Sequence, residues 1–457
     1  MKERIQDAVE RSRAGYSELR LRRIWSSTVL VRGREVDSAT STGETGGLAR
    51  CCSPGTGWGA VGFSGTAHLE GHLLRAHELS LAGASRQPLR LAPIPIRQIE
   101  SAPSPLPADD PRELALSTKR ERAERLAAVL LDSDRRLATG RIIVRDEVVE
   151  TWLATSEGTW IHDLRTRVSV SALAVAEQEG SSERALGSIG GAPGWPAGEA
   201  AEALLRSVAS RAVERLHAAP VRPGRYPVIL DPAAAGALMH RAVAHFARPA
   251  LPGADPDVLP LGTQLGPEIL TVGDDPTAPG LLAGSPYDDE GAVSRRCAII
   301  QNGVVLGHLH SRETAGATGQ APTGHARAGT LGGVPYPRAT NTFLAPGKGT
   351  LDDLLEGLPV GIYLADVLAC DASEAGVALR GAAARMIRDG RLAEPVKGVK
   401  LAGELLELLG RVDAVAGDFQ WDRAAARCRD GAAGLVPVTT GAPHLRLAPV
   451  EIGSEVS

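Results

Sequence analysis

Two histidines inside an apolar, helix-prone run constrain this chain more than any other feature. The run reads LMHRAVAHF at 238–246 and contains His240 and His245. At about 100° per residue, a spacing of five leaves two side chains roughly 140° apart on a straight α-helix. Two imidazoles that face one divalent ion such as zinc therefore require a π-bulge, which is common at functional sites, or a helix that ends before His245. Ordinary histidines also occur at this spacing, so these residues alone leave a metal site and a structural pair open.

Charge and cysteine content exclude several classes of partner. The 457 residues carry 50 basic and 54 acidic side chains, so no basic excess recruits nucleic acid or an anionic membrane surface. Five cysteines, an odd number that includes the adjacent Cys51 and Cys52, do not form a disulfide framework and fit a reducing cytoplasm. No run reaches the ~18 apolar residues of a membrane span. We expect a soluble, cytoplasmic protein with no nucleic-acid or membrane partner.

The length of 457 residues suggests two or three domains, and the order of expected elements favours an α+β protein of two domains. The first, residues 1–220, is expected to be an α/β domain, with short strands joined by glycine-rich turns over 16–66. Its proline-rich segment at 87–111 holds the backbone extended and is interpreted as a crossing or connecting stretch. Its other expected elements are helices at 112–131 and about 197–217 and strands at 141–154 and 168–177.

The second predicted domain covers residues 221–457. It begins where Pro220 and Pro223 interrupt the preceding helix, and it is rich in short strands and glycine. The pair Asn302-Gly303 between two apolar runs is a strong hairpin signal. His308 and His310 follow two residues apart and would share one strand face. We interpret them as a polar strand face, with a role as ligands left open.

Four stretches in the second half occur in an order that resembles the TldD/PmbA family of peptidases. They are PVILDP at 227–232, DDEG at 288–291, PTG at 322–324 and PYPRATNT at 335–342. The resemblance extends to GAVGF at 59–63, RVSVSA at 167–172 and PVKG at 395–398, so it covers nearly the whole chain. It implies a β-barrel-like C-terminal domain with a metal site at its edge, a zinc or similar cofactor, and paired subunits.

The resemblance also implies the site residues. His240 and His245 match the two histidine ligands of the family, and Cys428 matches its cysteine ligand. Arg241 stands where the active members carry a catalytic glutamate. A glutamate next to a metal-bound water accepts its proton before attack on a peptide carbonyl, whereas a guanidinium stays protonated and only donates hydrogen bonds. The substitution therefore argues against ordinary peptidase chemistry.

Three interpretations remain open at this point. The chain is a metal-dependent hydrolase or another metalloenzyme acting on a peptide or small molecule, with its base elsewhere: Asp289, Glu290 and Glu313 are the candidates. Alternatively, it is a silent subunit of a homodimer or of a heterodimer with a relative. The third interpretation is a degenerate copy whose histidines are ordinary polar core.

The stretch at 368–376 departs further from the family. The family shows adjacent glycines there, in what resembles a slot for an extended peptide. Here the stretch reads LACDASEAG, and its side chains are expected to crowd a peptide backbone. Cys370 is new relative to the family pattern, and is interpreted as an inert buried thiol rather than a fourth soft ligand.

Overall fold

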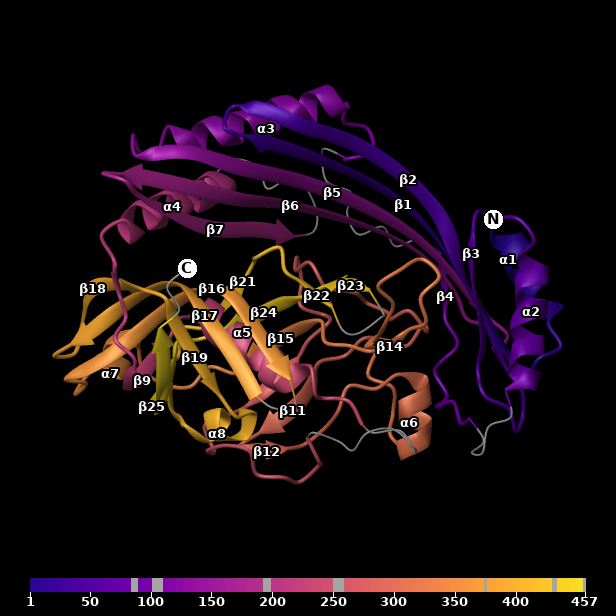
Figure 1. The fold of residues 1–457 in the computed structure, drawn as a ribbon. Coiled ribbons are helices and arrows are strands. Elements are labelled where there is room, and N and C mark those ends of the chain that lie inside the picture. The colour runs from indigo at the N-terminus through magenta and orange to yellow at the C-terminus, as the bar shows by residue number, and fades with distance from the viewer. Residues whose placement is uncertain are drawn as a thin grey trace.

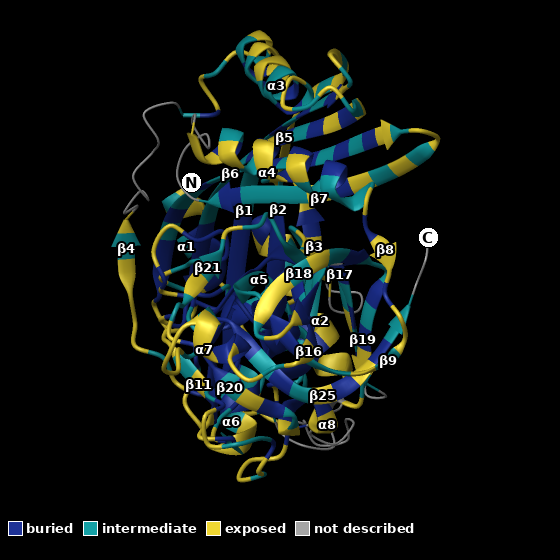
Figure 2. Cartoon of the chain, turned by 90° about the vertical axis from the view of Figure 1, so that its left-hand side faces the viewer, coloured by how far each residue is buried: buried dark blue, intermediate teal, exposed yellow. Residues whose placement is uncertain are grey.

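The computed structural model describes residues 1–83, 89–100, 110–191, 199–249, 259–373, 376–429 and 434–454. The fold is α+β and consists mostly of sheet. In Figure 1 a long, curved sheet from the N-terminal part of the chain arches over the more compact second half. Figure 2 shows buried residues gathered beneath this arch, while helices α3 and α4 present exposed residues outward.

The arch is a seven-stranded sheet in the order β3-β2-β1-β5-β6-β4, with β7 also paired to β6. Every strand pair in it is antiparallel except β4 with β6. The expected α/β arrangement is therefore wrong in its strand directions. The bounds are β1 Tyr16–Arg32, β2 Glu35–Cys52, β3 Gly59–Ser64, β4 Gln98–Glu100, β5 Leu137–Thr155, β6 Trp160–Gln178 and β7 Ser181–Gly191.

The strands of the arch are longer than the sequence pattern predicts. Strands β1 and β2 run for 17 and 18 residues, although glycines within β2 suggest turns. At Gly47 a Cβ would lie 2.1 Å from the carbonyl oxygen of Arg20 and 2.8 Å from the ring of Phe63. This glycine therefore permits close approach inside the sheet and does not end a strand.

Four helices pack on the arch: α1 Lys2–Glu10, α2 Leu69–Ala82, α3 Leu116–Leu131 and α4 Glu199–Arg215. The two helices expected at 112–131 and about 197–217 are confirmed as α3 and α4, which bury alanine, leucine and valine against β5, β6 and β7. Within the proline-rich segment at 87–111, residues 89–97 form neither helix nor strand before β4, and residues 87–88 and 101–109 lie outside the described part. Within the described residues, no helix has the length and apolarity needed to cross a membrane.

The second half contains two large sheets, with strand orders β12-β11-β10-β15-β24-β21 and β16-β9-β25-β19-β17-β18-β8. Strand β20 also pairs with β25, β16 also pairs with β17, and β13–β14 and β22–β23 form two small sheets. The strands are β8 Ala219–Pro220, β9 Gly224–Leu230, β10 Val272–Asp274, β11 Cys297–Gln301, β12 Val304–Val305, β13 Ala326–Arg327, β14 Tyr336–Pro337, β15 Asn341–Leu344, β16 Val360–Ser373, β17 Gly376–Arg388, β18 Arg391–Lys397, β19 Val399–Gly403, β20 Val412–Val415, β21 Gln420–Asp422, β22 Arg427–Arg429, β23 Leu435–Pro437, β24 Thr439–Ala442 and β25 Leu445–Ser454.

The barrel-like domain implied by the resemblance is matched only in part. The pairings β16–β9, β9–β25, β25–β19, β19–β17 and β17–β16 lead back to the first strand. Strand β17 pairs with β19 through Val377 to Arg380 but with β18 through Ala384 to Arg388, so β18 and β8 extend the sheet beyond this ring of pairings. One apolar core fills the space between the two large sheets and helix α5, Pro232–Met239.

The remaining helical segments of this half are η1 His240–Ala244, α6 Arg312–Thr318, α7 Leu351–Leu355 and α8 Leu405–Gly410. The predicted hairpin is confirmed: β11 and β12 meet at Asn302 and Gly303, which both have positive φ. His308 and His310 are buried in the segment after β12. The expectation of a polar strand face is wrong for both residues, because the strand ends at Val305 and their rings turn inward.

Candidate metal centre

The local sequence explains why a helix begins just before the two histidines. Asp231 is the N-cap of α5, and its carboxylate accepts a hydrogen bond of 2.7 Å from the backbone N–H of Ala234. Pro232 occupies the first turn, where its missing N–H costs nothing and its fixed φ suits a helix. The capped end therefore sets the register in which the helix reaches His240.

Helix α5 widens at His240 into the π-helical turn η1, and His245 is the residue that ends it. The His245 N–H donates to the His240 carbonyl oxygen at 3.1 Å, the spacing of a π-turn. The π-bulge and the helix end, the two alternative explanations of the histidine spacing, are therefore both present. The wide turn brings the two rings to a centroid distance of 5.3 Å at 87°, where a straight α-helix would turn them apart.

The hydrogen bonds around His240 determine which nitrogen can bind a metal. His240 is 4% exposed, and its Nδ1 lies 3.0 Å from the Thr342 hydroxyl oxygen. That hydroxyl donates its proton to Asp274 at 3.0 Å, so it accepts from the Nδ1–H of His240. Nε2 then carries the free lone pair, and it has no hydrogen-bond partner among the described residues. A histidine ligand oriented through its other nitrogen is the usual arrangement at protein metal sites.

The electrostatic environment keeps His240 neutral. Burial, then His245 and Arg241, lower the pKa of His240 to about 3. A histidine ligand must be neutral, and this imidazole is neutral at any physiological pH. Its environment therefore suits coordination better than a role as a charged surface group.

Cys428 completes the trio that the resemblance implies. The ligand atoms of His240, His245 and Cys428 all lie within 4.8 Å of one another, and Cys428 Sγ is 2.7 Å from His245 Nε2. Cys428 lies on β22, where Arg338 holds its carbonyl oxygen at 2.8 Å. Two imidazoles and one sulfur form a soft donor set of the kind that zinc accepts, with a fourth position left for water or substrate. The residues present fit such an ion.

Arg241 lies directly at this trio. Its Nη1 is 3.1 Å from His245 Nε2, the same nitrogen that faces Cys428. The small cavity at the three residues has a volume of about 10 Å³, and its described lining contains Arg248 and Arg338 but no carboxylate. Cations therefore lie beside the trio, and the described lining of its cavity offers no carboxylate as a proton acceptor.

The alternative bases predicted from sequence lie in other surroundings. Burial alone would raise the pKa of Asp289, but Arg22 and Arg20 lower it to about 2. Glu290 is fully buried, pairs with Arg50 at 2.7 Å and accepts the backbone N–H of Arg312 at 2.7 Å. Both carboxylates are engaged in structural ion pairs away from the trio.

Glu313 and Cys370 complete the set of predicted candidates. Glu313 accepts a hydrogen bond of 3.0 Å from the Trp58 indole, and burial raises its pKa. Cys370 packs against the core, and burial raises its pKa to about 12 although the charge of Arg241 opposes this. Since the thiolate is the metal-binding form, this environment favours the inert interpretation of Cys370. In the stretch at 368–376, Glu374 and Ala375 lie outside the described residues.

Sequence reasoning missed the residues that support the trio: Thr342, Asp274 and Arg338. Asp274 and Thr342 are direct cross-strand partners on β10 and β15, although 68 residues separate them in sequence. Asp274 is also 3.1 Å from Nε2 of the buried His325. Thr342 and Arg338 belong to the stretch PYPRATNT that carries part of the resemblance, but no periodicity in that stretch indicates their roles.

Comparisons with known proteins show the family to which the chain belongs. Residues 223–454 match the PmbA/TldA metallopeptidase C-terminal domain, and residues 109–219 match the central domain of the same family. A metalloprotease of Synechocystis sp. is 31% identical over 98% of this chain and 96% of its own length. A zinc metalloprotease TldD homolog of Saccharolobus solfataricus is 26% identical over 55% of this chain and 57% of its own.

Among solved structures, TldE from Thermococcus kodakarensis has the same fold. It superposes with a TM-score of 0.77 at 17% identity, over 99% of this chain and 100% of its own. About half of the chain matches the C-terminal domain of the family, and a relative above 30% identity aligns with nearly all of it. The chain therefore belongs to the PmbA/TldD family of metallopeptidases.

Proposed function

We propose that this chain holds a zinc-like ion on His240, His245 and Cys428, and that its peptidase chemistry is altered or lost. The observation that carries the proposal is the buried Nε2 of His240, which has no acceptor or donor partner among the described residues. Thr342 and Asp274 orient this nitrogen toward the other two ligand atoms. A buried polar atom without a partner is costly, and a metal ion would satisfy it.

The altered chemistry follows from Arg241. When bound, such an ion supplies a water of lowered pKa and polarises a substrate carbonyl. Hydrolysis also needs a group that accepts the proton of that water, and Arg241 offers only donors at this place. Its side chain instead suits an anionic partner, such as a substrate carboxylate or an oxyanion. We therefore propose an atypical metal-dependent hydrolase that acts on a peptide or small molecule.

A second candidate is a catalytically silent subunit of a dimer. The absence of a carboxylate from the described lining of the metal cavity favours it. TldD homologs and a TldE protein are both found among the similar proteins, so unlike members of one family could pair. In this case the partner is a second copy of this chain or a relative that carries the glutamate.

Elemental analysis of the purified protein tests the metal proposal. We expect about one zinc-like ion per chain in the parent protein and strongly reduced metal in Cys428→Ser, because the substitution removes the thiolate that favours zinc. Cys52→Ser is the matched control, since Cys52 is buried like Cys428 but lies on β2 of the arch. Equal, near-zero metal in all three proteins would contradict the proposal.

Light scattering and co-purification from the native cell test the assembly. We expect a dimer, either with a second copy of this chain or with a glutamate-bearing or metal-free relative. A strict monomer in both measurements would contradict the paired-subunit candidate. It would not bear on the metal proposal, which the elemental analysis tests separately.

A further inference from the structure

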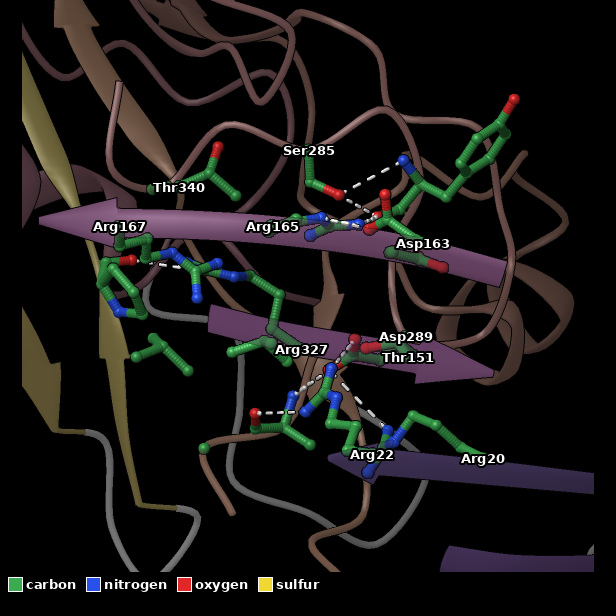
Figure 3. Close-up of a pocket in the computed structure, with 18 of the residues that line it drawn as sticks. Arg20, Arg22, Thr151, Asp163, Arg165, Arg167, Ser285, Asp289, Arg327 and Thr340 are labelled. Carbon is green, nitrogen blue, oxygen red and sulfur yellow. Dashed lines mark hydrogen bonds and ion pairs between the residues drawn. The ribbon is translucent and has the colours of Figure 1, made fainter. Parts of the chain in front are cut away.

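A cavity lined by arginines lies between the arch and the second half. Its volume is about 140 Å³, well above the roughly 10–15 Å³ that one water requires. Figure 3 shows Arg20 and Arg22 from β1 on one side, Arg165 and Arg167 from β6 on the other, and Arg327 between them in this view.

Strand alternation explains why so many guanidinium groups meet at one place. Residues two apart on a strand point to the same face, so Arg20 and Arg22 share a face of β1, and Arg165 and Arg167 share a face of β6. Strand β5 separates β1 from β6 in the sheet. The two pairs of arginines therefore lie on either side of β5, on the sheet face that is turned toward the second half of the chain. The second half contributes Arg327 and Arg427 to the same cavity.

The cavity carries more cations than anions. Six arginines line it against four carboxyl groups, Glu147, Asp163, Asp288 and Asp289. Burial and the neighbouring Glu290 raise the pKa of Asp288 well above its ordinary value, although three backbone N–H groups oppose this. Asp288 therefore offsets the guanidinium charge least of the four.

The ion pairs among the residues that line the cavity do not use all of the arginine N–H donors. Asp289 pairs with Arg22, and Glu147 lies between Arg167 at 3.1 Å and Arg427 at 3.4 Å. Arg327 donates to two carbonyl oxygens, of Ala339 at 2.7 Å and Pro437 at 2.8 Å.

Arg20 has the most unused capacity. Its side chain is 1% exposed, and its Nη1 is 3.7 Å from Asp289, beyond hydrogen-bond distance. Nε and Nη1 of Arg20 and Nε of Arg22 have no acceptor among the described residues. Burial and the charge of Arg22 lower the pKa of Arg20 to about 10, and burial and Arg167 lower that of Arg327 to about 9. These shifts mark a site where a further anion would be stabilised.

We infer that this cavity binds an oxyanion group of a ligand, a carboxylate or a phosphate. Planar guanidinium forks match the geometry of both groups, and the buried donors of Arg20 and Arg22 would receive the acceptors that they lack. Val436 lines both this cavity and the one at the metal trio, so the two sites share a wall. The inference does not depend on the proposed metal.

Binding to the full-length protein tests the inference. The probes are inorganic phosphate, a short N-acetylated peptide with a free C-terminal carboxylate, and the same peptide as its C-terminal amide. We expect phosphate or the peptide acid to raise the thermal midpoint in a concentration-dependent way, more than sodium chloride of equal ionic strength. Preference for the peptide acid over its amide would identify a carboxylate ligand, and preference for phosphate would identify a phosphorylated one.

Variants separate the cavity from general charge effects. Arg22→Gln and Arg327→Gln should each weaken binding about tenfold or more, as expected when a charged hydrogen-bond partner is lost. Arg32→Gln is the control, since Arg32 lies on the same strand but is 69% exposed and pairs with Asp37. Cys428→Ser should bind the oxyanion as the parent protein does, which distinguishes this site from the metal site. Binding that is absent from the parent protein, or unchanged in both cavity variants, would overturn the inference.

Discussion

The hydroxyl of Thr342 orients a ligand of the proposed metal centre. It accepts from Nδ1 of His240 and donates to Asp274, and so it fixes the imidazole with Nε2 toward Cys428. Burial alone would raise the pKa of Asp274, but the hydrogen bonds from His325 and Thr340 lower it. The chain of three groups therefore ends in a carboxylate that stays ionised.

Substitution at Thr342 tests this orientation. We expect Thr342→Val to weaken metal binding by about 10- to 100-fold, because loss of a group that orients a histidine ligand typically has this effect. Thr342→Ser keeps the hydroxyl and should bind metal as the parent protein does. Chelator competition measures both affinities, and equal weakening in the two variants would show that side-chain shape matters here rather than the hydrogen bond.

Arg241 places a positive charge beside His245, one of the proposed metal ligands. Arg241→Glu should tighten metal binding, because it replaces a cation beside His245 with an anion. Arg241→Gln removes the charge without adding a base and should give an intermediate affinity. Unchanged affinity in both variants would place residue 241 outside the metal site.

The same substitutions test the catalytic consequence on a broad peptide panel. A general base is typically worth about 10²- to 10⁴-fold in rate, but the altered stretch near Cys370 leads us to expect tighter metal binding without peptide cleavage in Arg241→Glu. Robust cleavage by the parent protein would show that another residue supplies the base.

At the scale of elements, the β11–β12 hairpin shows how a two-residue turn depends on its tertiary surroundings. Gly303 has φ +78°, and a Cβ there would lie 2.1 Å from the carbonyl oxygen of Gly266. Gly33, in the β1–β2 turn, has φ +59° with nothing within 4 Å of a Cβ. Both glycines have a positive φ, but only at Gly303 would a Cβ also clash with neighbouring backbone.

Paired alanine substitutions separate these two effects. Gly33→Ala should lower the free energy of unfolding by about 1–2 kcal/mol, the cost of a Cβ in the left-handed region. Gly303→Ala should lower the free energy of unfolding by more, because the neighbouring backbone at Gly266 must also shift. Urea denaturation measures both, and a smaller loss for Gly303→Ala than for Gly33→Ala would contradict the steric argument.

At the scale of the whole molecule, a buried ion network joins the arch to the second half. Arg50 on β2 pairs with Glu18 at 2.9 Å and with Glu290 at 2.7 Å, and all three side chains are 1% exposed or less. Burial would lower the pKa of Arg50, but Glu18 and Glu290 raise it above its usual range. The two halves are therefore connected by charges that cannot reach water.

Removal of Glu290 should destabilise the whole molecule. Breaking a buried pair costs about 3–5 kcal/mol when one charge loses its partner, and we expect the lower end for Glu290→Ala because Glu18 remains beside Arg50. Glu78→Ala is the control: its pair with Arg75 is exposed and should change stability by less than about 0.5 kcal/mol. Similar losses in the two variants would contradict a structural role for the network.

Local patterns in the sequence determined much of this architecture. Helix α3, helix α4 and the Asn302-Gly303 turn follow from periodicity and glycine chemistry, which act over a few residues. The wide turn between His240 and His245 is one of two explanations that their spacing leaves open. The family membership also follows from ordered motifs along the chain. The division near residue 220 stays a prediction, although each large sheet is drawn from one side of it except for the two-residue strand β8.

Only the tertiary structure decided what depends on distant strands. The lengths of β1 and β2, the change of neighbours along β17 and the pairing of Asp274 with Thr342 are set by cross-strand register, which no local pattern encodes. Arginines alternate in the sequence on β1 and β6, but their meeting across β5 arises when the sheet forms. Which charges and hydrogen-bonding groups become neighbours depends on how the folded chain brings distant residues together. The surroundings of Arg241 and of the arginine-lined cavity are therefore decided by the tertiary structure.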